Sequence, residues 1–459
     1  MRSSAQTLVY GLGESGEAAA RALAERGYAV RAADSGDSEA ARSAAARLGE
    51  LGVEVRLGAG VEALEGAGRV VTSPGIPPRD PVLSEAERRG LPVLSEVALG
   101  LELLEDGARV AAVTGTNGKT TVADMTRAIL EASGVPHVVA GNSWSAVTGR
   151  LEEIRRAGNL VLEVSSFQLH YLPEPGFEAA ALLNVRPDHM NWHSSFEEYA
   201  QDKLRVFEGQ SADDLALLSA HDPACVEAAP GLAARKLMVG SGDTRVAGED
   251  LYLRGERLLR ASELGFAGRH NHENALFAAA LAQSLGAGET GIRRGLTAYR
   301  LKPHRMQVVG ERGGVLYVDD SKATNPAAVA AALSGLDRPV VLLLGGSEKY
   351  TDFSEVADNL EGCRAAVCHG EAGERIARTL SGRAEAYGVQ VVRAAGLADA
   401  VSEAEARARA GDVVLLSPGC ASFDEFSGYA ERGAEFARLC GSDAETGLGT
   451  ANARRASGE

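Results

Sequence analysis

Long apolar runs, paired cysteines and an excess of basic residues are all missing from this sequence. The five cysteines are odd in number and scattered, without a CxxC pair, so we expect buried thiols in a reducing cytoplasm rather than a disulfide framework. No stretch approaches the roughly 20 apolar residues that a membrane-spanning helix needs. The first residues run into an expected strand without the apolar segment of a signal peptide. We therefore expect a cytoplasmic protein with no membrane span.

Acidic residues outnumber basic ones, with 63 Asp and Glu against 47 Lys and Arg, which gives a formal net charge of −16. A broadly basic surface for nucleic acid is therefore not expected, and an anionic substrate would need a local pocket of hydrogen-bond donors. The 459 residues, 45% of them hydrophobic and 24% charged, are typical of a globular protein. At roughly 150 residues per domain, about three domains are expected.

Short aliphatic runs alternate with stretches of Ala, Leu, Glu and Arg at helical spacing, which is the pattern of parallel sheets covered by helices. The predicted fold class is therefore α/β. New series of such units begin at Leu8, at Ala111 and beyond Pro303. The predicted domains are residues 1–107, 108–303 and 304–441, followed by a flexible tail at 442–459 that lacks periodicity.

The strongest local motif is a glycine-rich loop at residues 115–120, between an apolar strand and a helical pattern. Backbone N–H groups from Gly115 to Lys119, together with the start of the helix, would hold nucleotide phosphates. Lys119 would neutralise their charge, and Thr120 would bind Mg²⁺. The loop departs from the strict G-x-x-x-x-G-K-[ST] pattern because Val113 stands where its first glycine belongs. A turn that carries an exposed lysine is the alternative.

A second glycine loop, G-x-G-x-x-G from Gly11 to Gly16, directly follows the first expected strand. Asp34, near the end of the next strand, stands at about the offset of a ribose-binding acid. Alone, these residues favour an NAD-dependent oxidoreductase, but the backbone N–H groups of such a loop accept any nucleotide diphosphate, including that of a UDP-sugar. A further expected strand ends in a Pro- and Gly-containing turn at residues 72–77, which includes Ser73 and Gly75. A plain turn without a binding role is the alternative there.

Polar residues also interrupt or follow apolar strands of the second series. Glu163 is a carboxylate inside an apolar strand, which is costly unless it is paired or binds a metal, so it is a candidate Mg²⁺ ligand. His189 follows another apolar strand, and Lys203 lies in the next helical stretch. A hydrogen-bonded histidine and a solvated lysine are the alternatives. A functional role is favoured for His189 because it shares a domain with the phosphate loop and Glu163.

Together these motifs resemble those of the Mur ligase family, the cytoplasmic ATP-dependent enzymes that add amino acids to the peptidoglycan precursor. The resemblance extends over nearly the whole chain, to about Leu439, with the motifs in the family's order. The phosphate loop has the family's G-T-N-G-K-T form, and the family uses the first glycine loop for UDP rather than for NAD. The matching segments are Gly11–Gly16, Ser73–Ile76, Gly115–Thr120, Glu163–Leu169, Asn184–Met190, His270, Asn271, Asn274, Pro303–Arg305, Asp319–Asn325 and Ser417–Asp424.

The resemblance implies three domains: a Rossmann-like N-terminal domain, a central P-loop-type mononucleotide-binding domain and a Rossmann-like C-terminal domain. It implies that UDP-N-acetylmuramoyl-L-alanine, ATP and D-glutamate bind to them in that order. The UDP-substrate contacts would be Gly13, Glu14, Ser15, Asp34, Ser35, Ser73, Gly75 and Asn142. The ATP contacts would be Gly115, Thr116, Asn117, Gly118, Lys119, Thr120, Thr121, Asn271, Asn274, Arg305 and Asp320. The D-glutamate contacts would be Lys322, Thr324, Lys349, Ser422 and Phe423.

The implied reaction activates a carboxylate with ATP as an acyl phosphate, which an amine then attacks. Its catalytic residues would be Lys119, His189 and Lys203, with two Mg²⁺ ions. The metal ligands would be Thr120, Glu163, His189 and Lys203, the last as a carbamate that turns a cation into an oxygen donor. The implied setting is a cytoplasmic monomer in peptidoglycan synthesis, and hence in cell shape and division.

Three alternatives stay open. A sister ligase with another amino-acid specificity is the nearest, although the Asp-Asn-Pro-Arg run of the meso-diaminopimelate-adding relative does not occur in this sequence. An NAD-dependent oxidoreductase would leave the loop from Gly115 to Thr120 unexplained. A nucleotide-responsive binding protein would bind ATP without turning it over.

Overall fold

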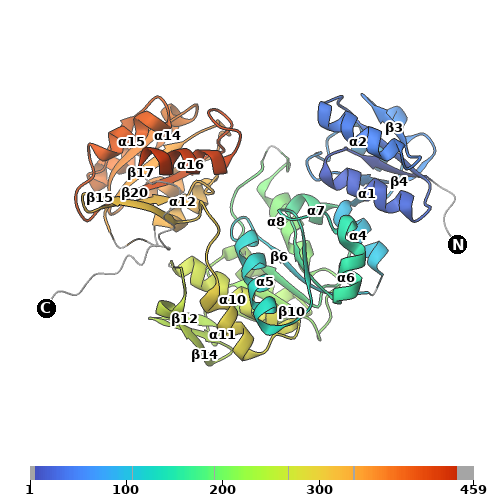
Figure 1. The fold of residues 1–459 in the computed structure, drawn as a ribbon, viewed down its shortest axis with the longest axis horizontal. Coiled ribbons are helices and arrows are strands. Elements are labelled where there is room, and N and C mark those ends of the chain that lie inside the picture. The colour runs from blue at the N-terminus through green and yellow to red at the C-terminus, as the bar shows by residue number, and fades with distance from the viewer. Residues whose placement is uncertain are drawn as a thin grey trace. The chain divides into compact units, whose positions relative to one another are not determined.

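The computed structural model describes residues 6–105, 107–190, 192–266, 268–333, 336 and 338–441. Three sheets of mainly parallel strands, each with helices on its faces, organise these residues, coloured blue, green and orange to red in Figure 1. The predicted α/β class is confirmed. All five cysteines are free and buried. No helix in the described part of the chain is both long and apolar enough to cross a membrane, and the predicted tail at 442–459 lies outside the described residues.

The chain divides into two compact units, which are described separately. The first holds the described residues of Met1–Arg245, Tyr252–Leu258 and Asn274–Leu296, and the second those of Val246–Leu251, Leu259–Glu273 and Thr297–Glu459. The N-terminal and central sheets belong to the first unit, and the C-terminal sheet belongs to the second. The domain boundaries at residues 107 and 303 stay predictions.

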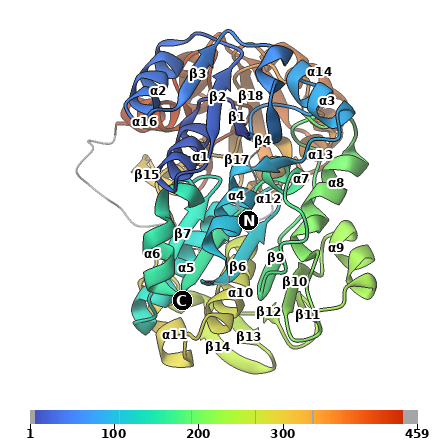
Figure 2. The same ribbon diagram turned by 90° about the vertical axis from the view of Figure 1, so that its right-hand side faces the viewer.

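The N-terminal sheet has the strand order β3-β2-β1-β4-β5, with every pair parallel. Alternate residues of β1 serve opposite faces: Val9 packs with α1, α2 and α4, whereas Leu8 and Tyr10 pack with α3. In Figure 2 this sheet lies between α1 and α2 on one side and α3 on the other. The elements are β1 (Gln6–Tyr10), α1 (Glu14–Glu25), β2 (Val30–Asp34), α2 (Glu39–Gly49), β3 (Glu54–Leu57), β4 (Ala67–Thr72), α3 (Pro81–Arg88), β5 (Val93–Ser95) and α4 (Glu96–Leu104).

The central sheet has the order β11-β10-β9-β6-β8-β7, again with every pair parallel. Because β6, β8 and β7 are neighbours, the loops that follow them meet at one edge of the sheet. The elements are β6 (Arg109–Thr114), α5 (Lys119–Ser133), β7 (Val138–Gly141), α6 (Leu151–Ala157), β8 (Asn159–Glu163), α7 (Ser166–His170), β9 (Ala179–Leu182), α8 (Phe196–Leu204), β10 (Leu215–Ser219), α9 (Pro223–Ala228) and β11 (Arg235–Val239).

Helices α10 (Arg269–Ser284) and α11 (Glu289–Ala298) follow a small sheet of β12 (Arg245–Ala247), β13 (Asp250–Leu253) and β14 (Glu256–Arg260). Gly295 lets α11 lie directly on α5, since a side chain there would come within 2.6 Å of the Ile129 backbone. The small sheet was not predicted, because its three short strands carry no strong alternation.

The C-terminal sheet has the order β15-β16-β20-β17-β18-β19; β15 is antiparallel to β16 and the other pairs are parallel. One face packs on α12, α13 and α14, and the other on α15 and α16. The elements are β15 (Gln307–Arg312), β16 (Val315–Asp319), α12 (Pro326–Leu333), β17 (Val340–Gly345), α13 (Ser354–Asp358), β18 (Cys363–His369), α14 (Gly373–Tyr387), β19 (Gln390–Arg393), α15 (Leu397–Glu405), β20 (Val413–Gly419) and α16 (Tyr429–Leu439).

The close packing of α1 on β1 generates a stability prediction. A Cβ at Gly16 would lie 1.8 Å from the carbonyl oxygen of Gly11, a backbone atom that cannot turn aside. Gly16→Ala should therefore lower the free energy of unfolding by about 1–3 kcal/mol, measured by urea denaturation. Gly49→Ala is the matched control, because this glycine ends α2 in open space. Equal losses in the two variants would contradict a role for this close contact.

Candidate active site

The predicted phosphate loop connects β6 to α5 at the carboxyl edge of the central sheet. Gly118 has a φ of +88° and caps the N-terminus of α5. Gly115 has a φ of +154°, and a side chain there would meet Leu183 at 3.0 Å. Only glycine fits both positions, and the loop therefore presents its backbone at the start of a 15-residue helix. The N–H groups of a helix start and the helix dipole make this a favourable place for a phosphate.

The loop after β9 holds the phosphate loop in shape. The Asn184 side chain accepts from Asn117 N at 2.8 Å and donates to Asn117 O at 3.2 Å, and Asn184 O accepts from Thr116 N at 2.9 Å. The Thr116 hydroxyl also lies 2.8 Å from the hydroxyl of buried Tyr199. These hydrogen bonds within the protein hold the phosphate loop in its conformation. Asn184 belongs to one of the matching segments, but no role was predicted for it.

Two lysine side chains meet at one carbonyl oxygen of this loop. Lys119 Nζ donates to Gly115 O at 2.7 Å and to Thr116 O at 2.9 Å, and Lys203 Nζ donates to the same Gly115 O at 2.9 Å. Lys203 is 2% exposed. Burial first, and then the positive charge of Lys119, hold the pKa of Lys203 well below its usual value.

Glu163, at the end of β8, is fully buried and gathers a set of donors. Its Oε1 accepts from Thr120 Oγ1 at 3.1 Å, Asn142 Nδ2 at 3.0 Å and Ser143 Oγ at 2.9 Å, and its Oε2 accepts from Trp144 Nε1 at 2.9 Å. Thr120 and Glu163, the predicted Mg²⁺ ligands, are therefore direct neighbours. Their oxygens have the chemistry that Mg²⁺ prefers. Asn142 lies here, after β7, and its role toward the UDP-substrate stays a prediction.

His189 lies in the loop between β9 and α8 in a backbone conformation that is rare for a non-glycine residue, with a φ of +58°. Its side chain is 46% exposed, and its ring packs edge-on against Phe167 at 4.9 Å between centroids. The imidazole is thus accessible to a ligand. Its predicted metal and catalytic roles stay predictions.

The Asn274 side chain of α10 also reaches this region of the first unit. Asn274 lies against the start of α5, where its Oδ1 is 3.0 Å from the position that a Cβ of Gly118 would take. Asn271, one turn earlier on α10, is 5% exposed. Asn274 thus lies beside the phosphate loop, and the contacts of Asn271 and Asn274 with the nucleotide stay predictions.

In the N-terminal domain, the loops after β1 and β4 meet where the strand order reverses, which is the usual ligand edge of such a sheet. The Ser73 hydroxyl donates to Gly11 O at 2.8 Å. Asp34 accepts from Leu12 N at 2.7 Å and from Gly36 N at 2.8 Å, so both of its oxygens bind backbone. The remaining predicted UDP contacts lie in the first turn of α1 or in adjoining loops: Gly13, Glu14, Ser15, Ser35 and Gly75.

In the second unit, Asp320 follows β16 and is buried. Its Oδ2 accepts from Ser417 Oγ at 2.9 Å and its Oδ1 from Met306 N at 3.2 Å. Burial raises the pKa of Asp320 to about 7, although these hydrogen bonds and the charge of Arg305 oppose the shift. Its neighbour Asp319 accepts from His304 Nδ1 at 2.6 Å.

The predicted D-glutamate residues lie on loops at the carboxyl edge of the C-terminal sheet. Lys322 Nζ lies 4.0 Å from the centroid of the Tyr429 ring, Ser422 is 2% exposed and Phe423 is 74% exposed. Lys349 is exposed and Thr324 half-buried. These residues offer cations and hydroxyl groups near one sheet edge, and their roles stay predictions.

Arg432 was not predicted from the sequence. It is 1% exposed on α16 and donates to Ser321 Oγ and Ser321 O at 2.9 Å each, Cys420 O at 3.0 Å and Ala421 O at 3.2 Å. Burial lowers its pKa to about 10. The guanidinium thus joins the loops after β16 and β20, which carry Lys322 and Ser422. A basic residue on the apolar side of the last helical pattern was the available signal.

Three family models match the chain in sequence order. They are the Mur ligase MurD-like N-terminal domain at residues 5–95, the Mur ligase middle domain at 113–282, and the Mur ligase glutamate ligase domain at 304–420. The chain belongs to the Mur ligase family, and the predicted resemblance and three-domain architecture are confirmed.

Individual proteins of the family share high sequence identity with this chain. The chain is 67% identical over 437 residues to the UDP-N-acetylmuramoylalanine--D-glutamate ligase of Rubrobacter xylanophilus, which covers 95% of this chain and 98% of that protein. It is 42% identical over 445 residues to the protein of the same name from Frankia casuarinae, covering 94% and 92%.

Solved structures agree at the level of the fold. A pseudomurein peptide ligase type C from Methanothermus fervidus matches with a TM-score of 0.58 at 17% identity, over 95% of this chain and 100% of that one. The UDP-N-acetylmuramate-alanine ligase from Thermotoga maritima matches with a TM-score of 0.56 at 18% identity, over 95% and 99%.

The raised pKa of Asp320 predicts a pH dependence of stability. The folded state keeps this proton up to about pH 7, whereas an unfolded aspartate loses it near pH 4. Stability from this group is therefore full below about pH 4 and falls as pH rises to about 7, by at most about 1.4 kcal/mol per pH unit. Asp320→Asn should remove that fall in urea denaturation curves, and exposed Asp399→Asn should retain it. Parallel pH profiles for Asp320→Asn and the unmodified protein would contradict the assignment.

Proposed function

We propose that this chain is an ATP-dependent ligase that joins D-glutamate to UDP-N-acetylmuramoyl-L-alanine. The observation that carries the proposal is the pair of contacts at the phosphate loop, where Lys119 and Lys203 both donate to Gly115 O and Thr120 donates to Glu163. The 67% identity to a ligase of that name supports the choice of substrates. The same proposal makes the protein a cytoplasmic monomer of peptidoglycan precursor synthesis.

The proposed reaction must activate a carboxylate, because joining a carboxylate to an amine in water is uphill. An oxygen of the alanyl carboxylate attacks the γ-phosphorus of ATP, the bond from that phosphorus to the bridging oxygen of ADP breaks, and an acyl phosphate forms. The amine of D-glutamate then attacks the acyl carbon and loses a proton. The tetrahedral intermediate expels phosphate and leaves an amide.

Charge control is the main task of the protein in the first step, since a carboxylate must approach a triphosphate. The N–H groups of the loop from Gly115 to Lys119 bind the phosphates, and the Lys119 ammonium can exchange its two carbonyl partners for phosphate oxygens. Thr120 and Glu163 would hold one Mg²⁺, and His189 with Lys203 a second. When bound, these ions supply positive charge at the transferring phosphoryl group.

Lys203 is suited to become a carbamate, because only a neutral amine reacts with CO₂. Its burial and the neighbouring Lys119 both favour the neutral form. The carbamate would replace a buried amine by carboxylate-like oxygens that bind a metal. The low pKa of Lys203 therefore supports the second Mg²⁺ site.

The outer domains would bind the two substrates that are joined. The glycine loop before α1 offers N–H groups to the UDP diphosphate. Lys322 and Lys349 supply cations for the two carboxylates of D-glutamate, with Thr324, Ser422 and Phe423 beside them. Arg305 and Asp320 would contact ATP from the start of the C-terminal domain.

The substrate assignment predicts strict dependence of phosphate release on two acceptors. In a phosphate-release assay, ATP turnover should require both UDP-N-acetylmuramoyl-L-alanine and D-glutamate, and an amino-acid panel should show D-glutamate alone as efficient. Turnover that ignores D-glutamate, or that prefers another amino acid, would replace this proposal with a sister ligase.

Removing the charge of the phosphate loop should cost far more than removing an exposed charge. Lys119→Ala should lower kcat by on the order of a hundredfold or more, because the negative charge on the transferring phosphoryl group would lose the ammonium group that stabilises it. Lys236→Ala, which removes an exposed lysine of β11, should leave kcat unchanged. Full activity of Lys119→Ala would show that the loop does not serve catalysis.

The carbamate can be observed directly. Protein equilibrated with carbon-13 bicarbonate should give a carbamate resonance in carbon-13 NMR, and Lys203→Arg should lose it because a guanidinium does not react with CO₂. Lys236→Ala should keep the resonance. A resonance that persists in Lys203→Arg would assign the carbamate to another amine, and its complete absence from the unmodified protein would remove the carbamate from the proposal.

A further inference from the structure

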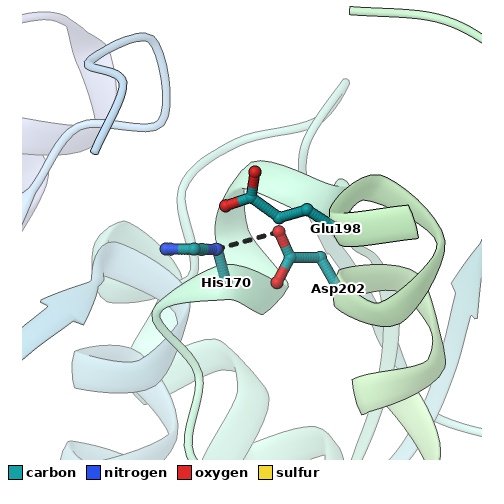
Figure 3. A group of neighbouring side chains, drawn as sticks. All are labelled: His170, Glu198 and Asp202. Atoms are coloured by element: carbon teal, nitrogen blue, oxygen red, sulfur yellow. Dashed lines mark hydrogen bonds and ion pairs between the residues drawn. The ribbon is translucent and has the colours of Figure 1, made fainter. Parts of the chain in front are cut away.

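Two imidazoles and two carboxylates converge between α7 and α8, and the proposed reaction uses none of them. Figure 3 shows His170, the last residue of α7, beside Glu198 and Asp202, which lie one turn apart on the same side of α8. A ligand atom from each of these three side chains lies within 4.8 Å of the other two. His193, from the loop before α8, reaches Asp202 as well.

The two histidines point their Nδ1 atoms at the same oxygen. His170 Nδ1 lies 2.8 Å and His193 Nδ1 3.3 Å from Asp202 Oδ2. Asp202 is 5% exposed and His193 is 2% exposed, so water does not solvate this meeting point freely. Glu198 and His170 are half-buried and leave an approach from the surface.

The buried Nδ1 of His193 has no well-formed hydrogen bond to the part of the chain that the structure describes. Among the described residues its nearest partner is Asp202 Oδ2 at 3.3 Å, a contact that does not meet hydrogen-bond geometry, whereas the other ring nitrogen lies 3.0 Å from Ser166 Oγ. An unpaired buried polar atom costs about 1–3 kcal/mol. If Nε2–H donates to Ser166, the Nδ1 lone pair faces a carboxylate oxygen, an arrangement that a cation between the two atoms would stabilise.

We propose that His170, His193, Glu198 and Asp202 bind one divalent transition-metal ion of the Zn²⁺ type. Two imidazole nitrogens and two carboxylate oxygens make a four-ligand set that suits Zn²⁺, whereas Mg²⁺ prefers oxygen ligands and water. Outer contacts already orient the ligands: Ser166 meets His193, and Ser194 N donates to Glu198 at 2.6 Å. The ion would join α7 to α8 next to Lys203.

The proposal is tested by metal titration of the full chain. Protein stripped with a chelator is titrated with Zn²⁺ against a chromogenic Zn²⁺ indicator, with Mg²⁺ in excess to occupy the oxygen-rich sites. One tight equivalent of Zn²⁺ is expected, and Co²⁺ in its place should give the intense visible absorption of a tetrahedral ion. His170→Ala and Asp202→Asn should each weaken Zn²⁺ binding by at least about tenfold.

Matched variants separate this site from others. His137→Ala removes an imidazole elsewhere in the central domain, and His189→Ala removes the predicted Mg²⁺ ligand, so both should keep the tight equivalent. Glu198→Gln is the variant to use if the buried substitutions prevent folding, as judged by circular dichroism, and it should weaken binding too. Absence of a tight equivalent, or equal binding by the Glu198→Gln and His137→Ala variants, would overturn the proposal and leave a metal-free hydrogen-bonded cluster.

Discussion

The carbonyl oxygen of Gly115 is the point on which the site depends. It accepts hydrogen bonds from both Lys119 and Lys203, one from the start of α5 and the other from the end of α8. Two ammonium groups at one oxygen repel each other, and Lys203 has no solvent to relieve the charge. The pKa of Lys203 is therefore held low, which favours its neutral amine, and Lys119 is the lysine that we propose to bind phosphates.

The surrounding sheet makes this meeting possible. Parallel pairing of β6 with β8 and β9 brings the loops after these strands to one edge, so Glu163 comes within hydrogen-bond distance of Thr120. Asn184 then holds the phosphate loop from the β9 side. The formal charge of −16 is compatible with the proposed anionic substrates because the proposed binding groups are local: backbone N–H groups, lysines and the proposed Mg²⁺ sites in an otherwise acidic protein.

Many strands of the fold and several residues of the candidate site could be predicted from the sequence, because the patterns that indicate them are local. The strands at Leu8, Ala111 and Val340 are apolar runs bounded by loops, and Glu163 stands out as a charge inside such a run. The antiparallel strand β15 and the cluster of His170 with Asp202 could not be predicted in this way. Both depend on contacts between residues distant in the chain, which no periodicity reports. The buried position of Arg432 was not predicted either, because an arginine on a helix is usually exposed.

The central claim is that the phosphate loop serves transfer of a phosphoryl group to a carboxylate, and isotope transfer tests it most directly. UDP-N-acetylmuramoyl-L-alanine labelled with oxygen-18 in its alanyl carboxylate would be turned over with ATP and D-glutamate, and the released phosphate analysed by mass spectrometry. Each phosphate is expected to carry one labelled oxygen from the carboxylate. Unlabelled phosphate, with all of the label outside it, would contradict an acyl phosphate and the roles proposed for Lys119 and Lys203.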